Sequence, residues 1–163
     1  IGAELVTLDY SDGFLPDSEE VAEQIAAIIR EAKPDILITH WIKSMHRDHE
    51  RAAKAAIRGA FLASIPREEL ETERHSVPTI LYAENWEDMD GFEADTFFGI
   101  PEEAYQRWLT GISEHAFARG ETYGFRFIDY YSALMQVKGC LVGEQRAAAF
   151  KTAGNEKFSL AGP

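Results

Sequence analysis

The sequence predicts an α/β fold with three layers, in which helices flank a mainly parallel, Rossmann-like sheet. Strand-like and helix-like patterns alternate along the chain, as parallel strands with helical crossovers require. The runs at 35–39 (DILIT) and 78–84 (PTILYAE) are short and largely apolar, which is typical of buried parallel strands. With 163 residues and 45% hydrophobic content, we expect residues 1–163 to form a single domain with one core.

The expected elements follow from apolar periodicity and from residues that begin or end helices. Asp17 can form a capping box with Glu20, and Pro34 disfavours a helical residue before it. In chain order we expect a strand at 4–8, a helix from Asp17 to about Lys33, the strand at 35–39, a helix from about Asp48 to Ser64, the strand at 78–84, a short strand at 95–100, a helix after Pro101 reaching about Ala118, and a helix at about 126–138. The pattern after Phe150 is weak.

Composition narrows the classes of partner. The formal charge of −12, from 16 basic and 28 acidic residues, is opposite to that of a protein that follows a phosphate backbone, so nucleic-acid binding is not expected. An anionic membrane surface would be repelled for the same reason. Cys140 is the single cysteine, which excludes an internal disulfide and fits a reducing compartment. No apolar run is long enough to span a bilayer and no signal peptide is recognised, so we expect a cytoplasmic protein.

The sequence SMHRDH at 44–49 brings together three side chains that bind metals or move protons: His46, Asp48 and His49. It follows the strand at 35–39, and ligands of parallel sheets bind beyond the carboxyl ends of strands. Imidazole is a favoured zinc ligand, and the positive end of a helix keeps it neutral. One histidine could therefore bind metal while the other, oriented by Asp48, handles a proton or an oxyanion. A further histidine, His40, ends the strand.

A structural interpretation of the same pattern stays open. Asp48 could cap the helix while both histidines lie at the surface, and a catalytic zinc site needs about three protein ligands, which this motif alone does not supply. His75 and His115 are expected at the surface or in packing rather than as ligands. Trp86, in the polar loop at 85–95, fits stacking on a sugar ring and core packing equally well.

The stretch at 34–61, PDILITHWIKSMHRDHERAAKAAIRGAF, resembles the second conserved block of the PIG-L/LmbE family of zinc-dependent de-N-acetylases. In that family a strand of the type P-D-[VIL]-[VIL]-[VIL]-T leads through a loop to H-x-D-H at the start of an alanine-rich helix. Weaker resemblances are found in GAELVTLDYSDGFL (2–15), TILYAENWEDMDGFEADTFFGI (79–100) and GEQRAAAF (143–150). Together they cover most of residues 1–150.

The resemblance implies a role for each residue of the motif. His49 matches the zinc ligand, His46 the histidine that stabilises the oxyanion or acts as general acid, and Asp48 the acid that orients the site. Asp12 matches a loop position that commonly contacts the sugar. Ser44 stands where some members place a tyrosine near the substrate carbonyl. We therefore expect His46 and Asp48 to be catalytic, His49 to bind the metal, and Asp12, Ser44 and Trp86 to contact substrate.

The resemblance also implies the reaction. Family members hydrolyse the acetamide of N-acetylglucosamine-type groups and release acetate and a free amine; the zinc, or another divalent metal, polarises the amide carbonyl. A small amino-sugar substrate and a homo-oligomer, a trimer or hexamer, are the implied partners.

One family block has no counterpart in residues 1–163: A-H-P-D-D-E, which supplies two further zinc ligands and a general base. We therefore expect this sequence to be the C-terminal two-thirds of such a domain, with the N-terminal part of the fold absent from it. The start at Ile1 agrees with that expectation. The alternatives are a sugar-binding pseudo-enzyme without catalytic metal, and a chain that needs a complementing partner.

Overall fold

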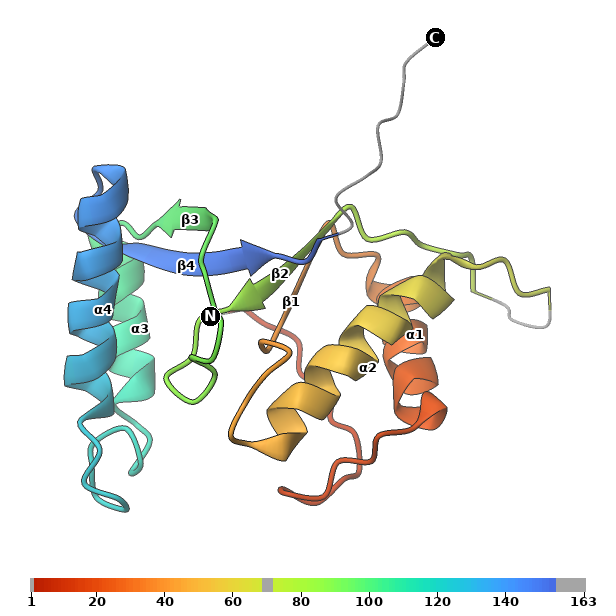
Figure 1. Cartoon of the computed structure of the whole chain (residues 1–163), viewed down its shortest axis with the longest axis horizontal. Helices are drawn as coiled ribbons and strands as arrows, with labels where there is room; N and C mark the ends of the chain where they lie inside the picture. Colours follow the sequence, from red (N-terminus) through yellow and green to blue (C-terminus); the bar gives the residue numbers. More distant parts are fainter. Residues whose placement is uncertain (1, 69–71, 155–163) are drawn as a thin grey trace, which may run out of the picture. The chain divides into compact units, whose positions relative to one another are not determined.

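The computed structural model describes residues 2–68 and 72–154 (Figure 1). In chain order its elements are α1 (Glu19–Ala32), β1 (Ile36–Thr39), α2 (Arg47–Ser64), β2 (Thr79–Ala83), β3 (Thr96–Gly99), α3 (Glu102–Ile112), α4 (Phe127–Val142) and β4 (Ala147–Thr152). Two compact units result: the described residues of 1–8 with Thr96–Ala149, and Asp9–Asp95 with the described residues from Phe150 onward. The expected single domain stays a prediction.

The second of these units contains the SMHRDH sequence, and its core lies between α1, α2 and the first two strands. Small residues of the two helices, Ala26 and Ala60 among them, pack with Leu37 of β1 and Ile80 of β2. Gly59 lets the helices approach closely, because a Cβ there would lie 2.8 Å from Ile25 Cγ2. This packing fixes the position of α2 and therefore of its first turn.

The sheet is mixed rather than mainly parallel. β1 pairs with β2 in parallel, with Ile36 opposite Thr79 and Thr39 opposite Tyr82. β2 then pairs with β4 in antiparallel orientation, and the strand order is β1-β2-β4-β3. The α/β class is confirmed, whereas β4 was not expected because its sequence, AAAFKT, lacks the β-branched pattern of a strand.

Several expected boundaries differ from the observed ones. Residues 4–8 form no strand, and the side chains of Leu5 and Val6 are exposed, because a strand needs a hydrogen-bonding neighbour and none of the described strands pairs with this segment. The first helix begins at Glu19 after Ser18, without the capping box expected from Asp17. The strand at 36–39 is partly buried on one face and exposed on the other, where Ile36 and Ile38 are about half exposed.

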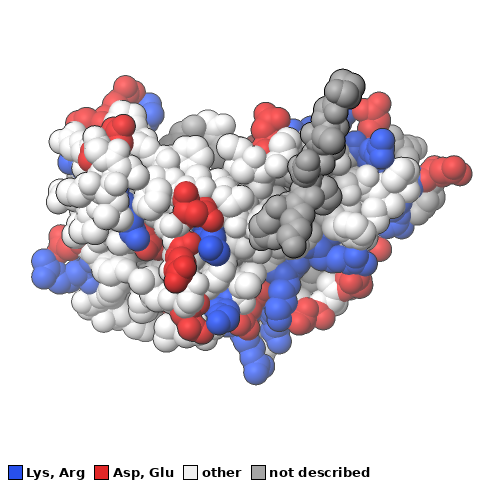
Figure 2. Space-filling view, turned by 45° about the horizontal axis from the view of Figure 1, so that its top comes forward, with Lys and Arg blue, Asp and Glu red and all other residues white. Residues whose placement is uncertain are grey.

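The other unit holds α3, α4, β3 and the start of β4. Arg146 of this unit forms an ion pair with Glu102, and its guanidinium lies 4.0 Å from the ring centre of Tyr105. α3 ends at Ile112 rather than near Ala118, and α4 extends to Val142, beyond the expected end. None of the helices in the described ranges is long and apolar enough to cross a membrane. Acidic and basic side chains are interleaved on the face that Figure 2 displays.

Candidate metal centre

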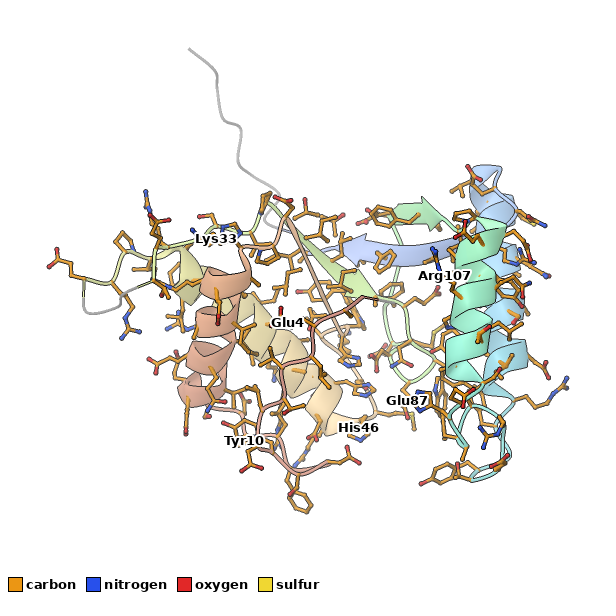
Figure 3. All side chains as sticks on the ribbon, turned by 180° about the vertical axis from the view of Figure 1, so that it is seen from behind. Glu4, Tyr10, Lys33, His46, Glu87 and Arg107 are labelled. Carbon is orange, nitrogen blue, oxygen red and sulfur yellow. The ribbon has the colours of Figure 1, made fainter. Side chains whose placement is uncertain are left out.

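The candidate site forms where the carboxyl ends of β1 and β2 meet. Because the two strands are parallel, the loop that follows β1 and the turn that follows β2 emerge at the same edge of the sheet. Met45 N donates a hydrogen bond to Glu87 O at 3.3 Å and joins the loop to the turn. Asn85 shapes the turn, since Asp88 N donates to its carbonyl at 3.0 Å and Glu87 N donates to its side chain at 3.3 Å. Figure 3 labels His46 and Glu87 on these two segments.

Three side chains at this edge could hold a metal ion: His40, His49 and Asp88. Their ligand atoms all lie within 4.8 Å of one another. The distance from His49 Nδ1 to Asp88 Oδ1 is 3.1 Å, and that from His40 Nδ1 to Asp88 Oδ2 is 3.4 Å. The two imidazole rings stack with their centres 3.9 Å apart. Two imidazoles and a carboxylate are a donor set that zinc takes in proteins.

Burial keeps this cluster suited to a cation. The side chain of Asp88 is fully buried, and its Oδ2 accepts no hydrogen bond from the residues that the structure describes. Burial of the ring, followed by the charge of nearby His49, lowers the pKa of His40 below 6.5, although Asp88 acts in the opposite direction. His40 is therefore neutral near pH 7, and a neutral imidazole is the form that binds metals.

His46 occupies a different position from His49. It is the N-cap of α2, and its Nδ1 accepts a hydrogen bond from Asp48 N at 3.3 Å. Its ring stacks on that of His49 with 4.7 Å between the centres, and its Nε2 lies 3.9 Å from Asp12 Oδ1. The interaction at Nδ1 leaves Nε2 as the nitrogen that can exchange a proton with a ligand. The structure thus places His46 beside His49, and Asp12 beside His46.

Asp48 is not the helix cap that its position suggested as one interpretation. Its carboxylate lies in the first turn of α2 and accepts hydrogen bonds from Gly13 N at 2.7 Å and Leu15 N at 3.2 Å. Arg51 reinforces the same loop by donating to Leu15 O at 2.7 Å. Asp48 therefore acts by holding the segment that carries Asp12.

The remaining two predicted substrate residues differ in what they contact. Ser44 Oγ accepts a hydrogen bond from His46 N at 2.9 Å and lies 3.4 Å from His49 Nδ1, so Ser44 supports the two histidines. Trp86 is half-buried in the turn after β2. A different tryptophan, Trp41, holds the loop at 85–95, because its Nε1 donates a hydrogen bond to Asp90 O at 2.8 Å and its ring packs edge-on against that of Phe92.

The sequence predicts only His49 as a metal ligand, and it does not predict such a role for His40, Asp88 or the adjacent Glu87. His40 was noted as the last residue of its strand, but its stacking on His49 depends on how the strand meets α2. Asp88 and Glu87 lie in an acidic loop, NWEDMD, whose charges the overall composition explains equally well. The available signal was that this loop follows a strand parallel to β1, which ends just before His40.

Residues 1–60 match the family model described as PIG-L: GlcNAc-PI de-N-acetylase. These residues include His40, His46, Asp48 and His49, whereas Asp88 lies beyond them. No curated protein matches the chain.

Three solved structures have a similar fold. The conserved protein TT1542 from Thermus thermophilus is 20% identical with a TM-score of 0.73, and the match covers 88% of this chain and 62% of that one. N,N'-diacetylchitobiose deacetylase from Pyrococcus horikoshii is 17% identical with a TM-score of 0.67, covering 88% and 55%. GalB, the 4-carboxy-2-hydroxymuconate hydratase from Pseudomonas putida, is 15% identical with a TM-score of 0.65, covering 83% and 59%.

These matches support the fold and not a single activity, because a deacetylase and a hydratase both appear among them. The chain spans 62% or less of the length of each of the three. The α/β fold of this chain therefore resembles that of TT1542, and the predicted resemblance to the PIG-L de-N-acetylases is confirmed by the match over residues 1–60.

Proposed function

We propose that the chain carries the metal-binding and proton-donating part of a zinc-dependent hydrolase that removes the acetyl group from an N-acetylglucosamine-type sugar or glycoconjugate. Water adds to the amide carbonyl, the C–N bond breaks, and the products are acetate and a free amine. The observation that carries the proposal is the cluster of His40, His49 and Asp88 at the edge of the sheet, with His46 stacked on His49. The three histidines lie within residues 1–60, which match the PIG-L family model.

A divalent metal fits the residues present. The cluster offers imidazole nitrogen and carboxylate oxygen within 4.8 Å, and a cation bound there would stabilise the charge of the buried Asp88 carboxylate. When bound, zinc supplies Lewis-acid polarisation of the amide carbonyl. The lowered pKa of His40 keeps that ring available as a ligand at neutral pH.

The residues around the cluster supply proton transfer and positioning. His46 Nε2 faces the same exposed region as Asp12 and can donate a proton to the departing amine or stabilise the oxyanion. Asp48 positions Asp12, whose carboxylate can accept hydrogen bonds from sugar hydroxyls. Ser44 orients both histidines, and Trp86 is proposed as a face against which the sugar ring stacks.

The test is acetate release from an N-acetylglucosaminide by the zinc-loaded product of the complete gene. We expect release that a chelator abolishes and that His49→Ala lowers by at least about 100-fold. His115→Ala is the matched control, because His115 is exposed and belongs to the other compact unit. Saccharide binding that is insensitive to chelator, without acetate release, would contradict the proposal and favour a sugar-binding protein without catalysis. The cytoplasmic location and the trimeric or hexameric state stay predictions.

A further inference from the structure

The three side chains of the candidate metal centre turn particular atoms toward one another. Asp88 Oδ1 lies 3.1 Å from His49 Nδ1, and Asp88 Oδ2 lies 3.4 Å from His40 Nδ1. A nitrogen and an oxygen bound to one tetrahedral zinc at about 2.0–2.2 Å lie roughly 3.4 Å apart. Both observed separations are close to that value. An ion between the Asp88 carboxylate and the two stacked rings would therefore bind the Nδ1 atom of each histidine.

The two histidines of this centre differ in their access to solvent. The side chain of His40 is 40% exposed, that of His49 is 19% exposed and that of Asp88 is 0% exposed. A catalytic metal keeps one coordination position open to water and substrate beside about three protein ligands. The open position therefore belongs on the His40 side, and His49 is the deeper histidine ligand, whose ring the surrounding protein must hold in place.

Glu87 lies at the other nitrogen of the His49 ring. A neutral imidazole carries one proton, so binding a metal through Nδ1 leaves that proton on Nε2. Glu87 Oε2 lies 3.7 Å from His49 Nε2. A hydrogen bond from this N–H needs a separation of at most about 3.2 Å, so the carboxylate has to approach by roughly 0.5 Å. The Glu87 side chain is 25% exposed, which leaves it room for that movement.

The backbone of Glu87, which Figure 3 labels, is held from two directions. Met45 N donates a hydrogen bond to Glu87 O at 3.3 Å, and Glu87 N donates one to the side chain of Asn85 at 3.3 Å. These contacts keep its side chain beside His49, whereas the carboxylate of Asp90 in the same loop is 82% exposed and lies 3.5 Å from Lys43 Nζ. Histidines that bind metals usually donate their second ring N–H to a carboxylate or a carbonyl, and Glu87 is placed to be that acceptor.

We propose that Glu87 is a positioning residue, which accepts a hydrogen bond from His49 Nε2 and so holds the ring with Nδ1 toward the metal. The ligands remain His40, His49 and Asp88. This inference rests on the metal site of the proposed function but not on the identity of the substrate.

The experiment uses Co²⁺ as the probe, because its visible absorption reports the ligands that touch the ion. The full chain, Glu87→Ala and Glu87→Gln are titrated with Co²⁺, and the affinity and the shape of the spectrum are recorded for each. Glu87→Ala should weaken binding by about 10-fold or more and leave the shape of the spectrum unchanged, because no ligand is lost. Glu87→Gln should weaken binding less, since its amide oxygen still accepts the hydrogen bond. Asp90→Asn is the matched control and should change neither quantity.

Nuclear magnetic resonance of the ¹⁵N-labelled, zinc-loaded chain tests the ring orientation directly. Correlation of ring protons with ring nitrogens distinguishes a nitrogen that binds metal from one that carries a proton. We expect His49 to bind zinc through Nδ1 and to carry its proton on Nε2.

Four results would overturn the assignment: no binding of Co²⁺ by the unmodified chain, a changed spectrum for Glu87→Ala, zinc on Nε2 of His49, or equal affinities of Glu87→Ala and Glu87→Gln. The changed spectrum would make Glu87 a ligand, and equal affinities would show that no hydrogen bond is involved. If all expectations hold and the product of the complete gene releases no acetate, the proposed function fails and the role of Glu87 stands.

Discussion

The two histidines of H-R-D-H lie three residues apart and have different surroundings. His49 is 19% exposed and lies 3.1 Å from a fully buried carboxylate, that of Asp88. His46 is 35% exposed, and the carboxylate facing it, that of Asp12, is 98% exposed and 3.9 Å away. A buried partner fixes a ring for metal binding, whereas a solvated partner leaves a ring free to exchange protons. The spacing of the motif brings both histidines to the start of α2. The role that we give each one follows from the carboxylate that faces it.

We expect the largest effects when each of the two histidines is replaced in turn, because the two replacements separate metal binding from proton transfer. His49→Ala should weaken zinc binding by more than about 100-fold because it removes a direct ligand, whereas His46→Ala should change it by less than about threefold. His46→Ala should nevertheless lower acetate release by about 100-fold or more, the usual effect of losing an acid–base group. Competition with a chromophoric chelator measures the first quantity and an acetate assay the second. Equal zinc affinities for the two variants would remove the distinction.

Removing the anchor of the loop that carries Asp12 should have the next largest effect. Asp48→Ala deletes the acceptor of two backbone hydrogen bonds, from Gly13 and Leu15, and should lower the free energy of unfolding by about 2 kcal/mol. KM should rise as the loop loosens, while zinc affinity changes little. Urea denaturation measures the stability, with Asp17→Ala as control because that side chain is exposed and lies 3.9 Å from Lys54 Nζ. A stable variant with normal KM would show that the loop is held by other contacts.

The metal-free chain should lose stability in acid through His40. The folded state lowers the pKa of His40 below 6.5, so the unfolded chain binds this proton more readily, and stability falls as pH decreases from 6.5 through the folded-state pKa. His49, Asp88 and Glu87 are the ionisable groups that contribute to the pKa of His40. His40→Gln should therefore show a smaller decrease in urea midpoint between about pH 8 and about pH 5. A steeper decrease in the variant would show that folding raises the pKa of His40 instead of lowering it.

The smallest effect is expected at the exposed partner of His46. Asp12→Ala removes a side chain that is 98% exposed, so the urea midpoint and the zinc affinity should both stay unchanged. KM for an N-acetylglucosaminide should rise several-fold if the carboxylate accepts hydrogen bonds from the sugar. Steady-state kinetics on Asp12→Ala and Asp12→Asn measure KM. An unchanged KM in both variants would show that Asp12 does not contact the sugar.

Local patterns predicted most of the fold, and pairing between distant segments decided the rest. The strands at 36–39, 79–83 and 96–99 were expected from their composition, and Pro34 and Pro101 marked helix boundaries. ELVTL at 4–8 has the composition of a strand but no pairing partner among the described strands. AAAFKT at 147–152 has a poor strand composition, yet it pairs with β2.

The site was predictable only in part for the same reason. His46, Asp48 and His49 could be identified because they are adjacent in sequence and follow a strand. Asp88 is 39 positions from His49 and is one of several acids in its loop, so its burial beneath the ring depends on the register of β1 and β2. The hydrogen bond from Gly13 N to the Asp48 carboxylate joins residues 35 positions apart, so it too depends on the tertiary fold.

The central claim, that His49 and not His46 holds the metal, is tested most directly by a crystal structure of the zinc-soaked chain with data collected at the zinc absorption edge. We expect one anomalous peak about 2.0–2.1 Å from a ring nitrogen of His49. Bonding of the ion to His46 with His49 outside coordination distance, or no anomalous peak at this edge of the sheet, would contradict the claim.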